Sequence, residues 1–290
     1  MLLGTIWSSS FLWIKIAVQE VGPITLVAFR VLFGLLFGLT VILIQRPKLP
    51  GTLREWAPVL LLGISNVAIP FFLISWGEQT IDSAVAAILD ATVPLFTIVV
   101  AHLALHDDRI TFHKTLGLLV GFAGVIVLVS KDFTGAAGSI FGQAAVVVAS
   151  MFYAGSSVFA RKTTENVPSI MRSVGPLISS TAVMWLATLT VERPIRLPHL
   201  PLTWVALVWL GVLGSGFAFI LNYYLIHEIG PTRTTMVTYL FPLGGVVLGV
   251  GFLHEQLSWQ LLAGAALIVA SLAVANYQPR STQVTNVQAP

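Results

Sequence analysis

The chain has 290 residues, of which 56% are hydrophobic and only 9% are charged, whereas soluble domains carry about 25% charged residues. This composition excludes a water-soluble globular protein and indicates a protein of the lipid bilayer. The net charge is +3, but the basic residues lie in short gaps between apolar runs and form no block or stripe, which excludes a basic surface for nucleic acid. Because the chain has no cysteine, disulfides, thiolate metal sites and a cysteine nucleophile are excluded as well.

Ten apolar runs follow one another along the chain. A transmembrane helix needs about 20 residues, so ten of them leave about 90 positions for loops and tails. The first run has no basic leader and another run follows closely, so we interpret it as a retained helix rather than a signal peptide. The ten expected spans are Leu2–Val18, Ile24–Ile44, Ala57–Gly77, Ser83–Leu105, Thr115–Val129, Ile140–Ala160, Ser173–Val191, Leu202–Ile226, Thr232–Leu253 and Ser258–Tyr277.

The basic residues alternate between the gaps, and this alternation predicts the orientation. With both termini in the cytoplasm, ten Lys and Arg residues lie inside and four near the other face, as the excess of cytoplasmic positive charge requires. The four near the other face are Lys15, Lys131, Arg193 and Arg196, and Arg30 lies inside a span. The polar segment 278–290 is expected to be a disordered cytoplasmic tail.

An internal repeat becomes visible when the sequence is shifted by 148 positions. The matched pairs include Trp56 with Trp204, Gly63 with Gly211, Pro94 with Pro242 and His106 with His254. We expect two repeats, residues 1–131 and 138–277, of five helices each. Because five is odd, the second repeat enters the membrane from the opposite side. Such inverted repeats place a binding site near the bilayer midplane and permit alternating access.

Two of the expected spans, the fourth and the ninth, carry small and polar residues on one face, which is expected to point inward. The stripes are Ser83, Ala87, Asp90, Pro94 and Thr97 in one span, and Pro231, Thr235, Thr238, Pro242, Gly245 and Gly249 in the other. Each proline removes a hydrogen bond from the carbonyl four residues earlier. The freed carbonyls of Asp90 and Thr238 are expected to line a cavity, although the prolines alternatively only bend the helices.

Two ionisable side chains, Arg30 and Asp90, lie well inside their spans at similar expected depths. An ionised carboxylate there costs about 2.5 to 3.5 kcal/mol, so a partner is required, and Arg30 is the candidate. One interpretation is a structural ion pair. The other is a site where one or both groups meet a charged substrate or a coupling proton.

Further candidate substrate-binding residues are polar or aromatic residues inside the spans. An aromatic residue in a helix often serves packing alone, and serine can bond to its own helix. Trp7 overlies Tyr153 in the repeat, which favours both as walls of a central cavity. These additional candidates are Trp7, Ser10, Asn66, Tyr153 and Tyr239.

Glycine pairs and short acidic segments are interpreted as structural. The GxxxG pairs Gly34/Gly38, Gly117/Gly121 and Gly245/Gly249 allow close helix contact, either inside the protein or across a dimer. The acids and caps Asp107, Asp108, Thr111, Glu255 and Ser258 are each expected to introduce the helix that follows them.

The sequence lacks HExxH, GxSxG and nucleotide-binding motifs, so neither an enzyme nor an ATP-driven pump is indicated, and no cofactor or metal is expected. The chain resembles the EamA-type branch of the drug/metabolite transporter superfamily. The residues that carry this resemblance are Trp7, Lys15, Pro23–Arg30, Pro94, Asp108–Thr111, Pro242 and His254–Ser258.

The resemblance implies a ten-helix carrier of the bacterial inner membrane that commonly exports metabolites. We therefore expect an all-α integral membrane protein, a secondary transporter of a small metabolite such as an amino acid or an amphipathic compound. The alternatives are multidrug efflux by the same fold and a structural membrane protein without transport. The expected partners are a small-molecule substrate, protons as a coupling ion and the bilayer, in a monomer or homodimer.

Overall fold

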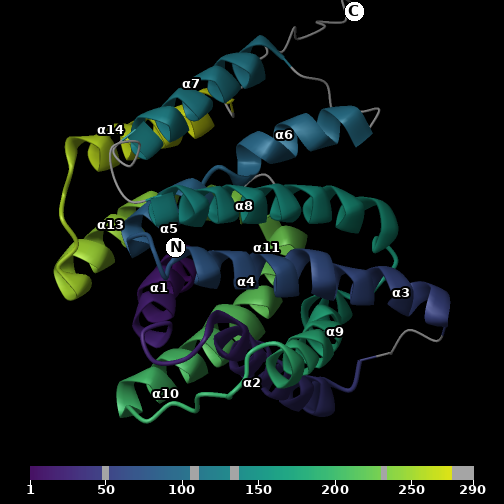
Figure 1. Cartoon of the computed structure of the whole chain (residues 1–290). Helices are drawn as coiled ribbons and strands as arrows, with labels where there is room; N and C mark the ends of the chain where they lie inside the picture. Colours follow the sequence, from purple (N-terminus) through teal and green to yellow (C-terminus); the bar gives the residue numbers. More distant parts are fainter. Residues whose placement is uncertain (48–51, 105–110, 131–136, 230–233, 276–290) are drawn as a thin grey trace, which may run out of the picture.

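The computed structural model describes residues 1–47, 52–104, 111–130, 137–229 and 234–275, and these residues form helices and connections without a β-strand (Figure 1). The expected tail 278–290 lies outside the described residues. The helices are α1 (Leu2–Ala17), α2 (Pro23–Gln45), α3 (Leu53–Leu62), η1 (Gly63–Ala68), α4 (Ile69–Gly77), α5 (Ser83–Asp90), α6 (Val93–Ala104), α7 (Phe112–Val129), α8 (Ala137–Thr163), α9 (Ser169–Thr190), α10 (Pro201–Val208), η3 (Trp209–Phe217), α11 (Ala218–Ile229), η4 (Thr235–Tyr239), α13 (Leu240–Leu253) and α14 (Trp259–Ala275).

Seven helical stretches within the described residues are long and apolar enough to cross a membrane, and three further apolar helices are shorter. The seven are Pro23–Gln45, Arg54–Gly77, Ser83–Ala104, Phe112–Val129, Ser139–Thr163, Ser169–Thr190 and Pro201–Ile226; the shorter ones are Leu2–Ala17, Val237–Leu253 and Trp259–Ala275. Each coincides with one of the expected spans. The protein is therefore an all-helical, multi-pass membrane protein.

The fourth and ninth spans are interrupted where Pro94 and Pro242 lie. α5 ends at Asp90, a turn at Ala91 and Thr92 follows, and Pro94 is the second residue of α6. In the ninth span a 3-10 segment, η4, precedes α13, of which Pro242 is the third residue. Because proline cannot donate a backbone hydrogen bond, it favours the first turn of a new helix over the interior of a long one.

Two π-helical segments, η1 and η3, widen the third and eighth spans. η1 covers Gly63–Ala68, and the positions 148 residues later, 211–216, all lie within η3 (Trp209–Phe217). The sequence analysis did not predict them. A π-turn shifts the backbone bonding from i−4 to i−5 and is frequent at functional sites. The two expected repeats thus share the same irregularity at the same place.

The small residues of α5 and α13 face each other in the interior; an inward orientation was expected, but this contact was not. Ser83, Ala87 and Asp90 are buried on α5. A Cβ atom at Gly249 would lie 3.0 Å from Ser83 Oγ, and one at Gly245 would collide with Ala87. Small residues at this contact therefore let the two helices approach closely.

Glycines also join α2 to η3. A Cβ atom added at Gly211 would lie 2.8 Å from the carbonyl oxygen of Arg30 and 3.2 Å from the backbone nitrogen of Gly34. The backbones of the two helices are therefore in direct contact. Gly34 takes part in this contact, and a Cβ at Gly38 would meet Val174 of α9, so both glycines lie at internal packing positions.

α7 and α14 pack along each other at the edge of the bundle, near the top of Figure 1. Their contact is made by glycines, because a Cβ at Gly117 would lie 2.8 Å from the carbonyl of Ser271, and one at Gly264 would lie 3.1 Å from that of Gly124. Thr111 caps α7 through the amide of Lys114, and Ser258 caps α14 through that of Leu261. Both caps were expected.

At one end of the bundle, which we call the capped end, three glutamates hold helix N-termini from a distance in sequence. This end comprises residues 18–22, 78–83, 191–200 and 254–258. Glu192 accepts from the amides of Ile24 and Thr25 at the start of α2. Glu20 accepts from the amides of His199 and Leu200 ahead of α10.

The third of these glutamates, Glu255, corrects an expectation. It accepts from the amides of Ser83 and Ala84 at 2.7 and 3.0 Å, so it caps α5 rather than the helix that follows it. Asp107, its counterpart in the repeat, and Asp108 lie outside the described residues. Carboxylates stabilise helix N-termini through both hydrogen bonds and the helix dipole. The capped end is thus closed by bonds between segments from distant parts of the chain.

Replacing Glu255 by alanine removes two hydrogen bonds at the start of α5 and is expected to cost about 1 to 2 kcal/mol. For a protein of this size the melting temperature in detergent should fall by about 2 to 4 °C for each kcal/mol. The neighbouring exposed Gln256→Ala serves as the matched control and should change it little. Equal melting temperatures for the two variants would show that the cap contributes no stability.

Candidate functional site

Arg30, in the first half of α2, is the centre of the candidate site. Its side chain is only 4% exposed. The guanidinium donates through Nε to Ser215 Oγ at 3.0 Å, and its carbon lies 3.6 Å from the centroid of the Phe71 ring. A cation over an aromatic face is attracted by the ring quadrupole. The charge is therefore held by α4 and η3 rather than by a carboxylate.

The π-segment η3 supplies the polar groups that face Arg30. Ser215 Oγ accepts from Arg30 while donating to the carbonyl of Leu210, five residues earlier. The carbonyl of Gly214 accepts from the indole nitrogen of Trp7 at 3.2 Å. Because a π-turn alters the helix's own bonding, it presents side chains and carbonyls that a regular α-helix would turn elsewhere.

Aromatic rings surround this polar centre. Trp7 on α1 packs edge-on against Phe219 and Phe241, with ring centroids 6.4 and 6.3 Å apart. Phe219 also contacts Phe71, at 6.3 Å. The cluster that we call the central site consists of Trp7, Arg30, Phe71, Ser215 and Phe219, together with Asp90 and Tyr153, which are described next.

Asp90 does not form the expected ion pair with Arg30. No nitrogen of Arg30 lies within 4.0 Å of its carboxylate, since the described contacts of Arg30 are with Ser215 and Phe71. Asp90 is buried at the end of α5, and its Oδ1 has no hydrogen-bond partner among the described residues. Asp90 and Tyr153 lie near enough to interact electrostatically with Arg30. The ion pair for which Arg30 was the candidate is therefore not formed among the described residues.

The other predicted residues lie around this centre without a direct bond to it. Ser10 is buried and bonds to the carbonyl of Ile6 in its own helix, although Gly214 lies beside its hydroxyl. Asn66 is half-buried on η1, and among the described residues no hydrogen bond joins it to Arg30 or Asp90. Pro94 and Pro242 lie at the helix interruptions. Thr238 and Tyr239 are half-buried on η4.

Four residues were missed from the sequence: Phe71, Ser215 and Phe219 at the central site, and Glu78 at the capped end. Glu78 directly follows the third span, so it has the sequence signature of an interfacial residue, yet it is fully buried. The placement of all four depends on contacts between distant segments.

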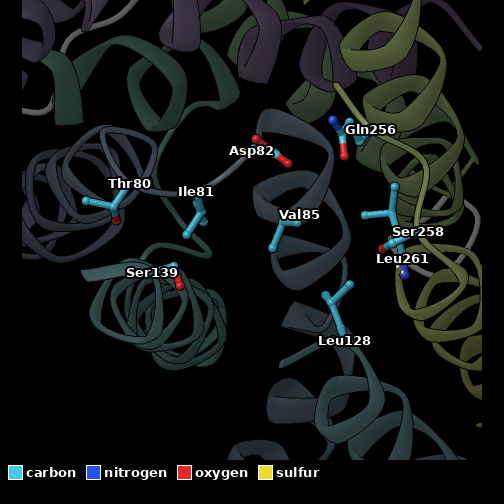
Figure 2. Close-up of a pocket in the computed structure, with 9 residues that line it drawn as sticks. All are labelled: Thr80, Ile81, Asp82, Val85, Leu128, Ser139, Gln256, Ser258 and Leu261. Atoms are coloured by element: carbon cyan, nitrogen blue, oxygen red, sulfur yellow. Dashed lines mark hydrogen bonds between the residues drawn. The ribbon is translucent and has the colours of Figure 1, made fainter. Parts of the chain in front are cut away.

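Two surface pockets lie at the capped end. One is a cavity of about 80 Å³ between α5 and the start of α14, and Figure 2 shows Val85 and Leu261 on its walls with Asp82 and Gln256 at its rim. A wider depression is lined by Lys15, Asp82 and Glu255. Among the described residues no group of three or more His, Asp or Glu side chains is arranged to hold a metal ion.

Chemically, the central site can bind a small molecule that carries charge and apolar surface together. The guanidinium has five N–H donors, of which the described hydrogen bonds use one, to Ser215. A buried carboxylate lies nearby and aromatic rings cover the remaining side. These groups come from α1, α2, α4, α5, α8, η3 and α11.

Comparison with known proteins finds relatives that are named as transporters. The chain is similar to the uncharacterized transporter YoaV of Bacillus subtilis, with 24% identity over 92% of this chain and 91% of the relative. It is 28% identical to the uncharacterized inner membrane transporter YedA of Escherichia coli, over 95% and 89% of the two chains.

A solved structure, titled only as the crystal structure of a protein, matches with a TM-score of 0.68 at 21% identity, covering 94% of this chain and 93% of the other. This likeness establishes the fold. The family model described as the EamA-like transporter family matches residues 1–130 and 140–277. The chain therefore belongs to the EamA-like transporter family.

Proposed function

We propose that the protein is a secondary transporter that moves a small amphipathic metabolite of the amino-acid type by alternating access. The observation that carries the proposal is the buried Arg30, which packs on Phe71 and bonds to Ser215 without a carboxylate partner. A buried cation without a direct ion-pair partner is costly in a membrane and marks a substrate or ion pathway. The carboxylate of a substrate would supply that direct partner.

Asp90 supplies the complementary charge in this proposal. Because it does not pair with Arg30 and its Oδ1 has no described partner, it is available to an ammonium group. An amino acid would then bind with its carboxylate toward Arg30 and its amine toward Asp90. The rings of Trp7, Phe71 and Phe219 would contact its side chain.

Alternating access requires two halves of opposite orientation. In our proposal all ten apolar helices cross the membrane, as the repeats 1–131 and 138–277. Two observations support this arrangement: the family model matches two successive stretches of the chain, and η1 and η3 occur at equivalent positions. Residues of the central site come from both proposed halves, as a site at their interface requires.

The proposed location is the bacterial inner membrane with both termini in the cytoplasm, so that the capped end faces outward. The excess of basic residues in the proposed cytoplasmic loops supports this orientation, and one relative is named an inner membrane transporter. Export is proposed as the direction, following the family resemblance.

Counterflow in proteoliposomes tests the function. Vesicles loaded with one unlabelled amino acid at a time are placed in trace amounts of the labelled compound, across a panel of amino acids. A carrier accumulates label transiently without any ion gradient. Absence of counterflow across the panel, with the protein correctly inserted, would contradict transport of this substrate class.

Asp90→Asn is expected to reduce counterflow at least tenfold. Hydrogen bonds to a charged group contribute about 1.5 to 3 kcal/mol, and asparagine keeps the shape without the charge. The measurement is the initial rate of label accumulation for the best substrate. Asp82→Asn, at the capped end, is the matched control and should keep most of the rate. Full activity of Asp90→Asn would remove this residue from the binding site.

A further inference from the structure

Glu78 is a fully buried carboxylate whose two oxygens have no hydrogen-bond partner among the described residues. It directly follows α4 and lies at the capped end. Burial of an ionised, unpaired carboxylate is among the most costly arrangements in a protein, and such groups instead bind a proton. The protein retains this group, and neither the fold nor the central site accounts for it.

The charged groups facing Glu78 come from four segments. They are Lys15 on α1, Arg30 on α2, Asp90 on α5 and Glu255 after α13. α8, which packs along α4, carries no charged residue between Ala137 and Ala160, and η1 carries none. Two cations and two further carboxylates therefore surround Glu78, so its neighbours provide no net positive charge.

Lys15, the nearest candidate partner, is occupied by the main chain. Its ammonium donates to the backbone carbonyls of Glu78 and Ile81 at 2.8 and 2.6 Å. No ion pair within 4.0 Å joins it to the Glu78 carboxylate in the described structure. Burial raises the pKa of Glu78 well above its usual value. The positive charge of Lys15 lowers this pKa in part, but the effect of burial is larger. Burial in this structure therefore favours the protonated form of Glu78.

The capped end separates Glu78 from water. Glu255 binds the amides at the start of α5, next to the loop that follows Glu78. Figure 2 shows Thr80, Ile81 and Asp82 of this loop. Glu192 and Glu20 close α2 and α10 beside it. The Thr203 hydroxyl and the amides of His199 and Leu200 lower the pKa of Glu20, so this cap stays ionised at neutral pH.

We propose that Glu78 is the proton-binding site of the transporter: it holds one proton while the capped end is closed and releases it to water when that end opens. The inference rests on the proposed function, because it requires two states of the capped end. The direction of the pH dependence follows from the linkage between proton binding and closure. The closed state binds the proton more tightly, so low pH favours closure and rising pH favours opening.

The absence of native cysteine makes the test direct. Ser83→Cys places a thiol at a position that is 1% exposed beneath the Glu255 cap. Gln79→Cys places one at an exposed position of the same loop and reports the intrinsic pH dependence of the reaction. Val21→Cys, at a position 2% exposed in the α1–α2 turn, is a second buried reporter. Each variant is placed in lipid nanodiscs, where both faces of the protein are accessible, and is labelled with a charged maleimide between pH 6 and pH 8.

We expect the labelling rate of the buried thiol, divided by that of Gln79→Cys, to rise with pH by up to about tenfold per unit, the limit for one proton. With Glu78→Gln added, which mimics the protonated group, the ratio should stay at its low-pH value throughout. A ratio that does not change with pH, or a rise that persists in Glu78→Gln, would overturn the inference.

Counterflow by the same proteins separates the two proposals. It needs no pH gradient, so it reports transport independently of proton coupling. If counterflow is present but labelling does not depend on pH, the Glu78 inference fails and the transport function stands. If no counterflow occurs, the transport function itself fails.

Discussion

Replacing Arg30 by alanine is expected to reduce counterflow at least tenfold while the protein still inserts and folds. Removal of a buried charge relieves its desolvation cost, and Ser215 keeps its bond to Leu210, so the fold should persist. What is lost is the cation for the substrate carboxylate, worth about 1.5 to 3 kcal/mol or about 10- to 150-fold in binding. The initial counterflow rate is the measurement.

Arg30→Lys distinguishes a need for charge from a need for the guanidinium. Lysine lacks the planar group that packs on Phe71 and cannot bind a carboxylate through two parallel hydrogen bonds, so it should also impair transport. Arg54→Ala, at an exposed position near the start of α3, is the matched control. Normal exchange by Arg30→Ala would show that Arg30 serves only helix packing.

Gly211→Ala is expected to destabilise the protein by about 1 to 3 kcal/mol, because an added methyl group would overlap main-chain atoms. The new Cβ would lie 2.8 Å from the carbonyl oxygen of Arg30, and neither backbone can move without separating α2 from η3. That separation would also displace Ser215 from Arg30. Both the melting temperature and the counterflow rate should therefore fall.

Gly251→Ala is the matched control for that substitution. A Cβ at Gly251, in α13, would meet no atom within 4 Å, so the change should be neutral or stabilise the helix by about 0.5 to 1 kcal/mol. Opposite signs for two Gly→Ala changes would establish that the effect comes from the α2–η3 contact. Equal melting temperatures for the two variants would contradict a stabilising role of the α2–η3 contact.

Hydropathy predicted the helices well, because each apolar run must form a helix long enough to satisfy its backbone in lipid. Pro94 and Pro242 were expected to free carbonyls or to bend their helices, for a similarly local reason, but the division of each span into two helices was not predicted. The π-segments were not predicted, since no single residue marks them. They lie where Gly63 and Gly211 meet other helices at main-chain distance.

The candidate site was predicted only in part, since depth along a helix follows from sequence but rotation and neighbours do not. Arg30 was paired with Asp90 because of their opposite charges. In the structure the guanidinium instead contacts the ring of Phe71 and the hydroxyl of Ser215. Glu255 was assigned to the next helix because local capping patterns reach only a few residues. Glu78 was overlooked because only the folded chain buries it.

The packing of α7 against α14 has a consequence for biosynthesis. From the end of α7 at Val129 to the start of α14 at Trp259 is 130 residues, which takes about 7 to 26 s to synthesise at about 5 to 20 residues per second. During that interval Gly117 and Gly124 of α7 lack the partners that α14 supplies. The contact between the two helices is thus completed only after α14 has been synthesised.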